Sequence, residues 1–107
     1  SKVERLRYDM ANRRLSWELP VVTPRQHPIA GVEIAWRVDA SLPWTVQTTV
    51  LVDQPQELLF EDVPVGEMFY RAVVIDAVGA RGTDAVISAT GAYDPPGAVT
   101  NFIAVDE

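Results

Sequence analysis

The chain has 107 residues, of which 48% are hydrophobic, no cysteine, and a formal net charge of −6. This length leaves room for one domain with a core, while the missing cysteines exclude disulfides, zinc-thiolate sites and thiol catalysis. The acidic balance argues against nucleic acid, whose phosphates need a basic stripe. No run of 18 apolar residues could span a membrane, and no signal peptide opens the chain. We therefore expect any export signal to lie in a missing part of a longer parent protein.

Strand signals follow one another along the chain, separated by turn residues, and helix signals are almost absent. Residues 3–8 mix β-formers with charges, as in an edge strand, and residues 15–19 alternate apolar and polar side chains. Three prolines between residues 20 and 28 predict a loop. Further strands are expected over residues 31–39, 44–52, 57–63, 68–76 and 84–91. Seven short strands spaced by Pro, Gly, Asn and Asp favour an antiparallel β-sandwich.

The strand expected over residues 68–76 is apolar on both faces. Because Arg71 resists burial, the face without it should point to the core; that face carries Met68, Tyr70, Ala72 and Val74. The opposite, outer face then holds Arg71, which is able to pair with Glu33, and three apolar residues: Phe69, Val73 and Ile75. Two interpretations stay open for these three residues. They form a contact surface for a neighbouring module or subunit, or the stem of Arg71 and other side chains cover them.

The three tryptophans raise the question whether their indole rings could stack on sugar rings. Alternation places Trp17 and Trp36 on the inward faces of their strands, whereas Trp44 follows Pro43 at a turn and is expected to be exposed. One exposed indole is a poor platform for a sugar ring. The tryptophans therefore give little support to glycan binding.

Several marks resemble a fibronectin type III domain, and they stand in the family's order along the chain. They are Leu15-Ser16-Trp17 followed by Pro20, residues 31–37, which look like Gly-Tyr-x-Ile-x-Tyr-Arg with Val and Trp at the aromatic positions, Val63-Pro64-x-Gly66, and residues 71–79. The resemblance covers about residues 1–93 and implies a seven-strand antiparallel immunoglobulin-like sandwich. Met68 departs from the family, which usually carries the tyrosine of its corner motif there. Either that tyrosine's hydrogen bond to the main chain is lost, or Phe69 and Tyr70 shift to compensate.

The end of the chain resembles its beginning. Val99 stands three residues before Phe102 and is followed by Asp106, just as Val3 stands three residues before Leu6 and is followed by Asp9. The stiff junction Asp94-Pro95-Pro96-Gly97 stands before the second copy. This pattern predicts a domain at residues 1–93, a Pro-rich linker at residues 94–98 and the start of a following module at residues 99–107. The junction is most similar to those between modules of bacteriophage tail-tip, host-specificity proteins. Secreted bacterial carbohydrate-active enzymes carry similar spacers.

The turn Arg81-Gly82-Thr83-Asp84 falls where some fibronectin type III domains display Arg-Gly-Asp to receptors, but Thr83 interrupts the tripeptide. Gly82 is expected to supply a positive φ for the hairpin. In this fold the loop over residues 20–28 and the turn over residues 79–84 emerge at the same end of the sandwich. The candidate loop-tip binding residues are therefore Arg25, His27, Arg81 and Asp84.

The sequence carries no catalytic constellation. There is one histidine, no Gly-x-Ser-x-Gly elbow and no phosphate-cradling glycine loop, and Glu57, Glu61 and Asp62 form no acid–base pair. His27 stands in a Pro-bounded loop without a second histidine at ligand spacing, so it is expected at the surface rather than on a metal. We therefore predict a domain that is not an enzyme and has no catalytic, cofactor-binding or metal site.

These observations predict a structural and interaction module, a spacer that positions other parts of a multidomain protein. The resemblance of the junction implies a phage or prophage tail host-specificity protein, located in the virion, or extracellular or at the cell surface. The expected partners are neighbouring modules of the same chain and other subunits of a tail or surface assembly, without nucleic acid or membrane insertion. One alternative is a loop-tip binding module for a cell-surface glycan or receptor. The other is an accessory domain of a secreted polysaccharide-degrading enzyme.

Overall fold

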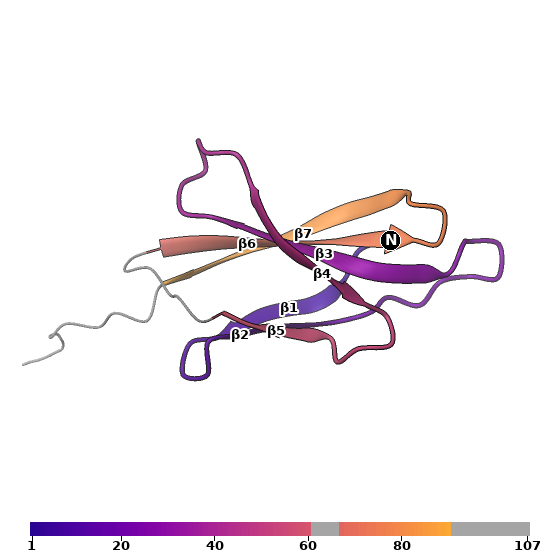
Figure 1. Ribbon diagram of the computed structural model, residues 1–107, viewed down its shortest axis with the longest axis horizontal. Coiled ribbons are helices and arrows are strands. Elements are labelled where there is room, and N and C mark those ends of the chain that lie inside the picture. The colour runs from indigo at the N-terminus through magenta and orange to yellow at the C-terminus, as the bar shows by residue number, and fades with distance from the viewer. Residues whose placement is uncertain (61–66, 91–107) are drawn as a thin grey trace, which may run out of the picture.

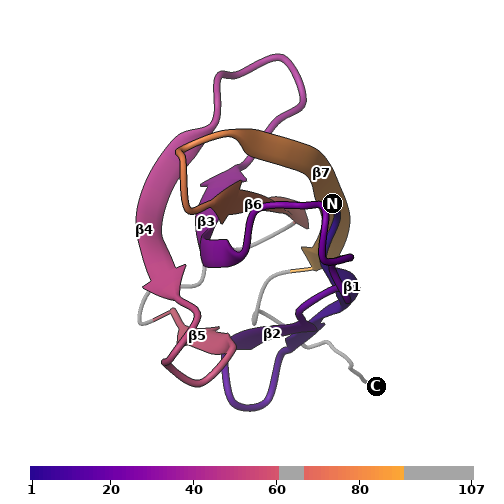
Figure 2. The same ribbon diagram turned by 90° about the vertical axis from the view of Figure 1, so that its right-hand side faces the viewer.

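The computed structural model describes residues 1–60 and 67–90, and these residues form seven β-strands (Figure 1). The strands are β1 (Glu4–Asp9), β2 (Arg14–Glu18), β3 (Ile29–Arg37), β4 (Thr45–Leu51), β5 (Glu57–Leu59), β6 (Glu67–Asp76) and β7 (Arg81–Thr90). All pairs are antiparallel, in a three-stranded sheet ordered β1-β2-β5 and a four-stranded sheet ordered β4-β3-β6-β7. The two sheets pack face to face (Figures 1 and 2). The predicted immunoglobulin-like, fibronectin type III-like sandwich is confirmed.

The core lies between the two sheets and is built from the inward residues of each strand. Its largest fully buried side chains are Leu15 from β2, Val32 and Ile34 from β3, and Tyr70 from β6. Met68, Ala72 and Val74 join Tyr70 in this cluster, so the prediction for the inward face of β6 is confirmed. Within the described residues, no helix is present that could cross a membrane.

Tyr70 is the aromatic centre of the core. Its ring stacks on Tyr8 at a centroid distance of 4.9 Å and meets Phe60 at 5.1 Å. The hydroxyl group donates to the sulfur of Met68 at 3.3 Å, and burial raises the pKa of the phenol above its ordinary value. The Tyr70 hydroxyl group is thus bonded inside the core. Tyr70 stands two residues after Met68, which occupies the family's corner position. Pro64 lies outside the described residues.

The β6–β7 hairpin closes earlier than the sequence predicts. The carboxylate of Asp76 accepts hydrogen bonds from the backbone amides of Val78 and Ala80 at 3.0 and 2.9 Å, which folds a tight turn directly after β6. Gly79, with φ of 88°, supplies the left-handed residue that this turn needs. Consequently β7 begins at Arg81, three residues before the predicted start.

The prediction that Gly82 supplies a positive φ was wrong, because Gly79 takes that conformation. Gly82 is required for a different reason. A Cβ atom there would collide with the backbone carbonyl of Ser1, which accepts a hydrogen bond from the amide of Thr83 at 2.9 Å. Gly82 therefore allows the start of the chain to approach β7 closely.

Several predicted features lie outside the described residues. These are the Pro-rich linker at residues 94–98, the start of a following module at residues 99–107, the Val63-Pro64-x-Gly66 mark, and the acidic residues Glu61 and Asp62. Of the strand predicted over residues 57–63, residues 57–60 are described, and β5 covers the first three of them.

Candidate functional site

The structure brings the loop over residues 20–28 and the β6–β7 turn together at one end of the sandwich, here called the tip. The backbone amide of Ala77 donates to the carbonyl of Pro28 at 2.9 Å, which ties the loop to the turn. Within the loop, the side chain of Gln26 accepts from the amide of Thr23 at 2.7 Å, while the amide of Gln26 donates to the carbonyl of Thr23. The loop is therefore held by two backbone–backbone hydrogen bonds and by one to the side chain of Gln26, although it contains three prolines.

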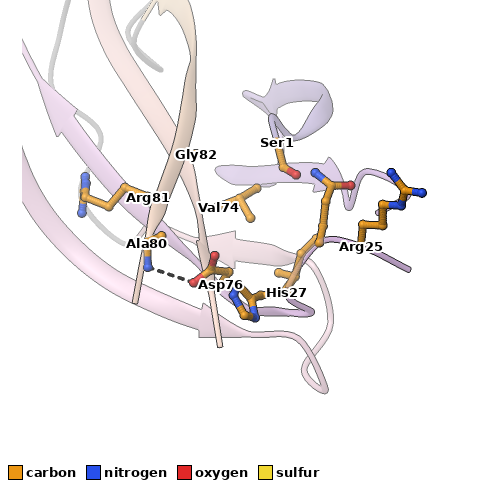
Figure 3. Close-up of a pocket in the computed structure, with 10 residues that line it drawn as sticks. Ser1, Arg25, His27, Val74, Asp76, Ala80, Arg81 and Gly82 are labelled. Carbon is orange, nitrogen blue, oxygen red and sulfur yellow. Dashed lines mark hydrogen bonds between the residues drawn. The ribbon is translucent and has the colours of Figure 1, made fainter. Parts of the chain in front are cut away.

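A cavity of about 250 Å³ opens at the tip (Figure 3). Its apolar walls come from Ile29 and Val74, and its polar lining includes Ser1, Arg25, Gln26, His27, Asp76 and Arg81. The carboxylate of Asp76 is occupied by the two turn amides described above. Arg25 and His27 are both exposed, so the hydrogen-bond donors at the mouth come from the loop.

Three of the four predicted tip residues line this cavity, and one does not. Asp84 lies within β7 in register with Val73, and opposite residues in an antiparallel pair share a face, so it belongs to the outer face of the sheet. Its predicted place at the tip was based on a turn reaching residue 84, whereas the turn ends at Ala80. Asp76 was not predicted as a tip residue, although an Asp shortly before a turn glycine is the signal of a side chain that caps the turn.

Arg81 lines the cavity with its stem rather than its charge. Its Nη2 atom donates to Oε1 of Glu33 at 2.6 Å, and in Figure 3 its guanidinium points away from Asp76 and His27. The hydrogen bond raises the pKa of Arg81 and, as the largest cause, lowers the pKa of Glu33. Of the two arginines that line the cavity, Arg25 is therefore the one whose charge is not already paired with a carboxylate.

The outer face of the four-stranded sheet, the face turned away from the other sheet, is the second candidate site. Glu33 on β3 also pairs with Arg71 on β6 at 3.6 Å, which is the pairing that the sequence suggested. Its carboxylate therefore lies between two guanidinium groups from different strands. This arrangement keeps three charged groups on a sheet face without leaving the carboxylate isolated.

The expectation that Trp44 is exposed was wrong. Its ring is half-buried against two arginines, with the guanidinium carbon of Arg37 at 4.1 Å and that of Arg71 at 5.0 Å from the ring centroid. Arg37 also donates to the carbonyl of Leu42 at 3.1 Å, which fixes the loop before β4. The three side chains form what we call the Arg37–Trp44–Arg71 stack, held by cation–π attraction.

The predicted outer-face contact residues are largely covered. Val73 is only 3% exposed, while Phe69 and Ile75 are half-buried.

The other two tryptophans are not fully exposed either. Trp17 is buried in the core, and Trp36 is half-buried, with its indole N–H donating to Gln47. All three indoles are thus at least partly buried.

Six acidic side chains of the described residues, those of Asp9, Glu18, Glu33, Asp39, Glu57 and Asp76, are used in turns and ion pairs. Asp9 and Asp39 accept hydrogen bonds within the turns that follow them, and these bonds lower the pKa of both carboxyl groups: the side chain of Asn12 acts on Asp9 and the amide of Ser41 on Asp39. Glu18 pairs with Arg5, and Glu57 with Arg14. In the part of the chain that the structure describes, no group of three His, Cys, Asp or Glu side chains could hold a metal ion.

No protein-family model matches this chain, and no curated protein sequence is significantly similar to it. The assignment of the fold therefore depends on strand order and register. Any role for the tip or the outer face has to be argued from the geometry described above.

Proposed function

We propose that this domain is a non-catalytic structural and interaction module that spaces and positions other parts of a multidomain protein. The observation that supports this function best is the distance between the segment at Ser1 and the end of β7. Ser1 lies at the tip beside Gly82, and β7 runs from the tip to Thr90 at the far end of the sandwich (Figure 1). Ten residues of strand span about 33 Å. Segments joined at the two ends would be held about that far apart.

The use of the carboxylates supports a non-catalytic role. A general acid at neutral pH needs a raised pKa, whereas Asp9, Glu33 and Asp39 have pKa values below the ordinary range because each accepts hydrogen bonds. The same groups hold turns and strands in place. Their chemistry is that of structural acceptors.

The parent that we propose is a phage or prophage tail host-specificity protein, with neighbouring modules and other tail subunits as partners. Support comes from the sequence, in which a Pro-Pro-Gly junction is followed by a segment that resembles the first strand of the domain. An extended, semi-rigid junction would continue the spacing that the sandwich begins.

Immunogold electron microscopy with antibodies against residues 1–93 tests this assignment on source cells and on any particles that they release. Gold at the tips of phage tails is the expected result. Gold on cell walls or in the culture fluid, with bare particles, would contradict the virion assignment and favour a secreted enzyme or adhesin.

The cavity at the tip supports a second candidate function, binding of a cell-surface glycan or receptor. Arg25 and His27 present exposed donors at its mouth, which suit a ligand rich in hydrogen-bond acceptors. Binding of the labelled protein to host cells should then fall when Arg25 and His27 are both changed to Ala. Arg7→Ala, on the exposed side of β1, is the matched control. Equal binding by the double variant and the control would exclude the tip.

A further inference from the structure

Within residues 1–60 and 67–90, the two sheets end in four edge strands, β1 and β5 in one sheet and β4 and β7 in the other. An edge strand presents backbone N–H and C=O groups that can pair with another chain. Proteins protect such edges with charges, bulges, short strands or a covering segment. The four edges of this sandwich differ in how far they are protected.

Three of the edges carry evident protection. Strand β1 is charged at Glu4, Arg5, Arg7 and Asp9 and has an irregular register around Arg5, whose φ is 53°. Strand β5 is only three residues long. Strand β7 lies beside the start of the chain, to which the amide of Thr83 donates.

Strand β4 is different. Its sequence, Thr-Val-Gln-Thr-Thr-Val-Leu, contains no charged residue, no proline and no glycine, and every residue except Val50 is exposed. In Figure 2, β4 forms the outer margin of its sheet. A register shift against β3 makes Gln47 an extra residue, but its side chain accepts a hydrogen bond from Trp36 and adds no charge to the edge.

The hydrogen-bond pattern shows which part of this edge is open. The amide of Val52 donates to Ala30, so that residue faces β3, and Leu51 faces the free edge by alternation. The side chains of Gln54 and Gln56 occupy the N–H and C=O groups of Leu51 at 2.9 and 3.1 Å. Thr49 is in phase with Leu51, so its backbone groups also point to the free edge. The glutamines thus close the end of β4, and no strand of the described part of the chain lies along the free side of residues 45–49.

We propose that β4 pairs with β4 of a second copy of this chain, antiparallel about a two-fold axis near Thr48. The contact would join two four-stranded sheets into one eight-stranded sheet and leave the glutamine caps in place. It is an isologous contact, in which the same patch serves both copies. It concerns the side of the sandwich and does not depend on the proposed function.

Charge is the reason for choosing a second copy as the partner. Each copy carries a net charge of −6, which opposes self-association, so a second copy can pair only through an edge that adds no further like-charge repulsion. Self-pairing of β4 places no two charges opposite each other, and Thr, Val and Gln are suitable cross-strand neighbours. The exposed Val46 and Leu51, 54% and 50% accessible, lie along the same strand and would lose solvent contact on pairing.

Analytical ultracentrifugation of the full 107-residue chain over a wide concentration range tests the proposal. The unchanged chain is expected to form a dimer. Thr48→Lys puts two like charges near the axis and should weaken the dimer by at least about tenfold. Thr23→Lys, the same change on the exposed tip loop, is the control and should dimerise normally. A chain that stays monomeric, or Thr48→Lys dimerising like the control, would overturn the proposal.

A cysteine crosslink provides a second test, because the chain has no cysteine of its own. Thr48→Cys places a single thiol near the axis, where opposite Cα atoms of an antiparallel pair come within disulfide range. Mild oxidation should give a covalent dimer of this variant but not of Ser88→Cys, whose exposed thiol lies on β7. Equal crosslinking of both variants would contradict pairing through β4. Near-ultraviolet circular dichroism checks that both variants fold.

Discussion

Both faces of β6, an inner strand of the four-stranded sheet, are covered, but different interactions cover them. On the inner face, Tyr70 packs among apolar and aromatic side chains from both sheets. On the outer face, the Arg37–Trp44–Arg71 stack and the carboxylate of Glu33 lie over a sheet whose Val73 is nearly inaccessible. Within the described residues, Val73 is thus buried on a face that has no second layer of strands. Apolar residues on both faces of a strand do not by themselves indicate a partner.

The largest effect is expected from truncating the inner face at Tyr70. Tyr70→Ala removes a buried ring that touches Tyr8 and Phe60 and should lower the free energy of unfolding by about 3–5 kcal/mol. Urea denaturation followed by tryptophan fluorescence measures this loss. Tyr70→Phe keeps the ring and should cost about 1 kcal/mol or less. A loss for Tyr70→Ala no larger than that for Trp44→Ala would break the distinction between the two faces.

A smaller effect is expected from the outer face. Trp44→Ala removes two cation–π contacts and should lower the free energy of unfolding by about 1–2 kcal/mol. Trp44→Phe retains a ring with weaker cation–π attraction, so its free energy of unfolding should lie between those of the wild type and Trp44→Ala. The same denaturation experiment applies. An unchanged stability would mean that the stack does not contribute to holding the outer face.

The ion pairs of the outer face predict a pH dependence. The pKa of Glu33 is lowered in the folded state by the hydrogen bond from Arg81, so its contribution is complete above the unfolded value of about 4.3 and is lost as the pH falls. Glu33→Gln should therefore lose less stability than the wild type between pH 6 and pH 3. Arg81→Ala, which removes the main cause of the shift, should change the pH profile in the same direction. A Glu33→Gln profile identical to the wild type would contradict this account.

The smallest effect is expected at the tip. Arg25→Ala and His27→Ala alter exposed loop side chains and should leave the free energy of unfolding unchanged within about 0.5 kcal/mol. Thermal melts of both variants measure this. A larger loss would show that these side chains support the sandwich, and a loss of cell binding could then no longer be read as loss of a ligand contact.

The sequence predicts those features of the fold that depend on local pattern. Alternation identified the strands, and the reluctance of Arg71 to be buried decided which face of β6 points inward, as the buried Met68 and Val74 confirm. Prediction from the sequence failed where segments that are distant along the chain meet in the fold. The cover over Trp44 comes from arginines on two other strands, and the need for Gly82 comes from the approach of Ser1. Asp84 was misplaced because the capping of the turn by Asp76 was not recognised.

The position of Ser1 and Thr90 at opposite ends of the sandwich has a mechanical consequence. A pulling force applied through the two ends would act along the length of β1 and β7 rather than across them. The hydrogen bonds of β1 to β2 and of β7 to β6 would then be loaded together in shear. Strands peeled from a free end lose their bonds one after another, whereas strands in shear must break many at once. The same topology that separates the ends thus equips the domain to resist extension under load.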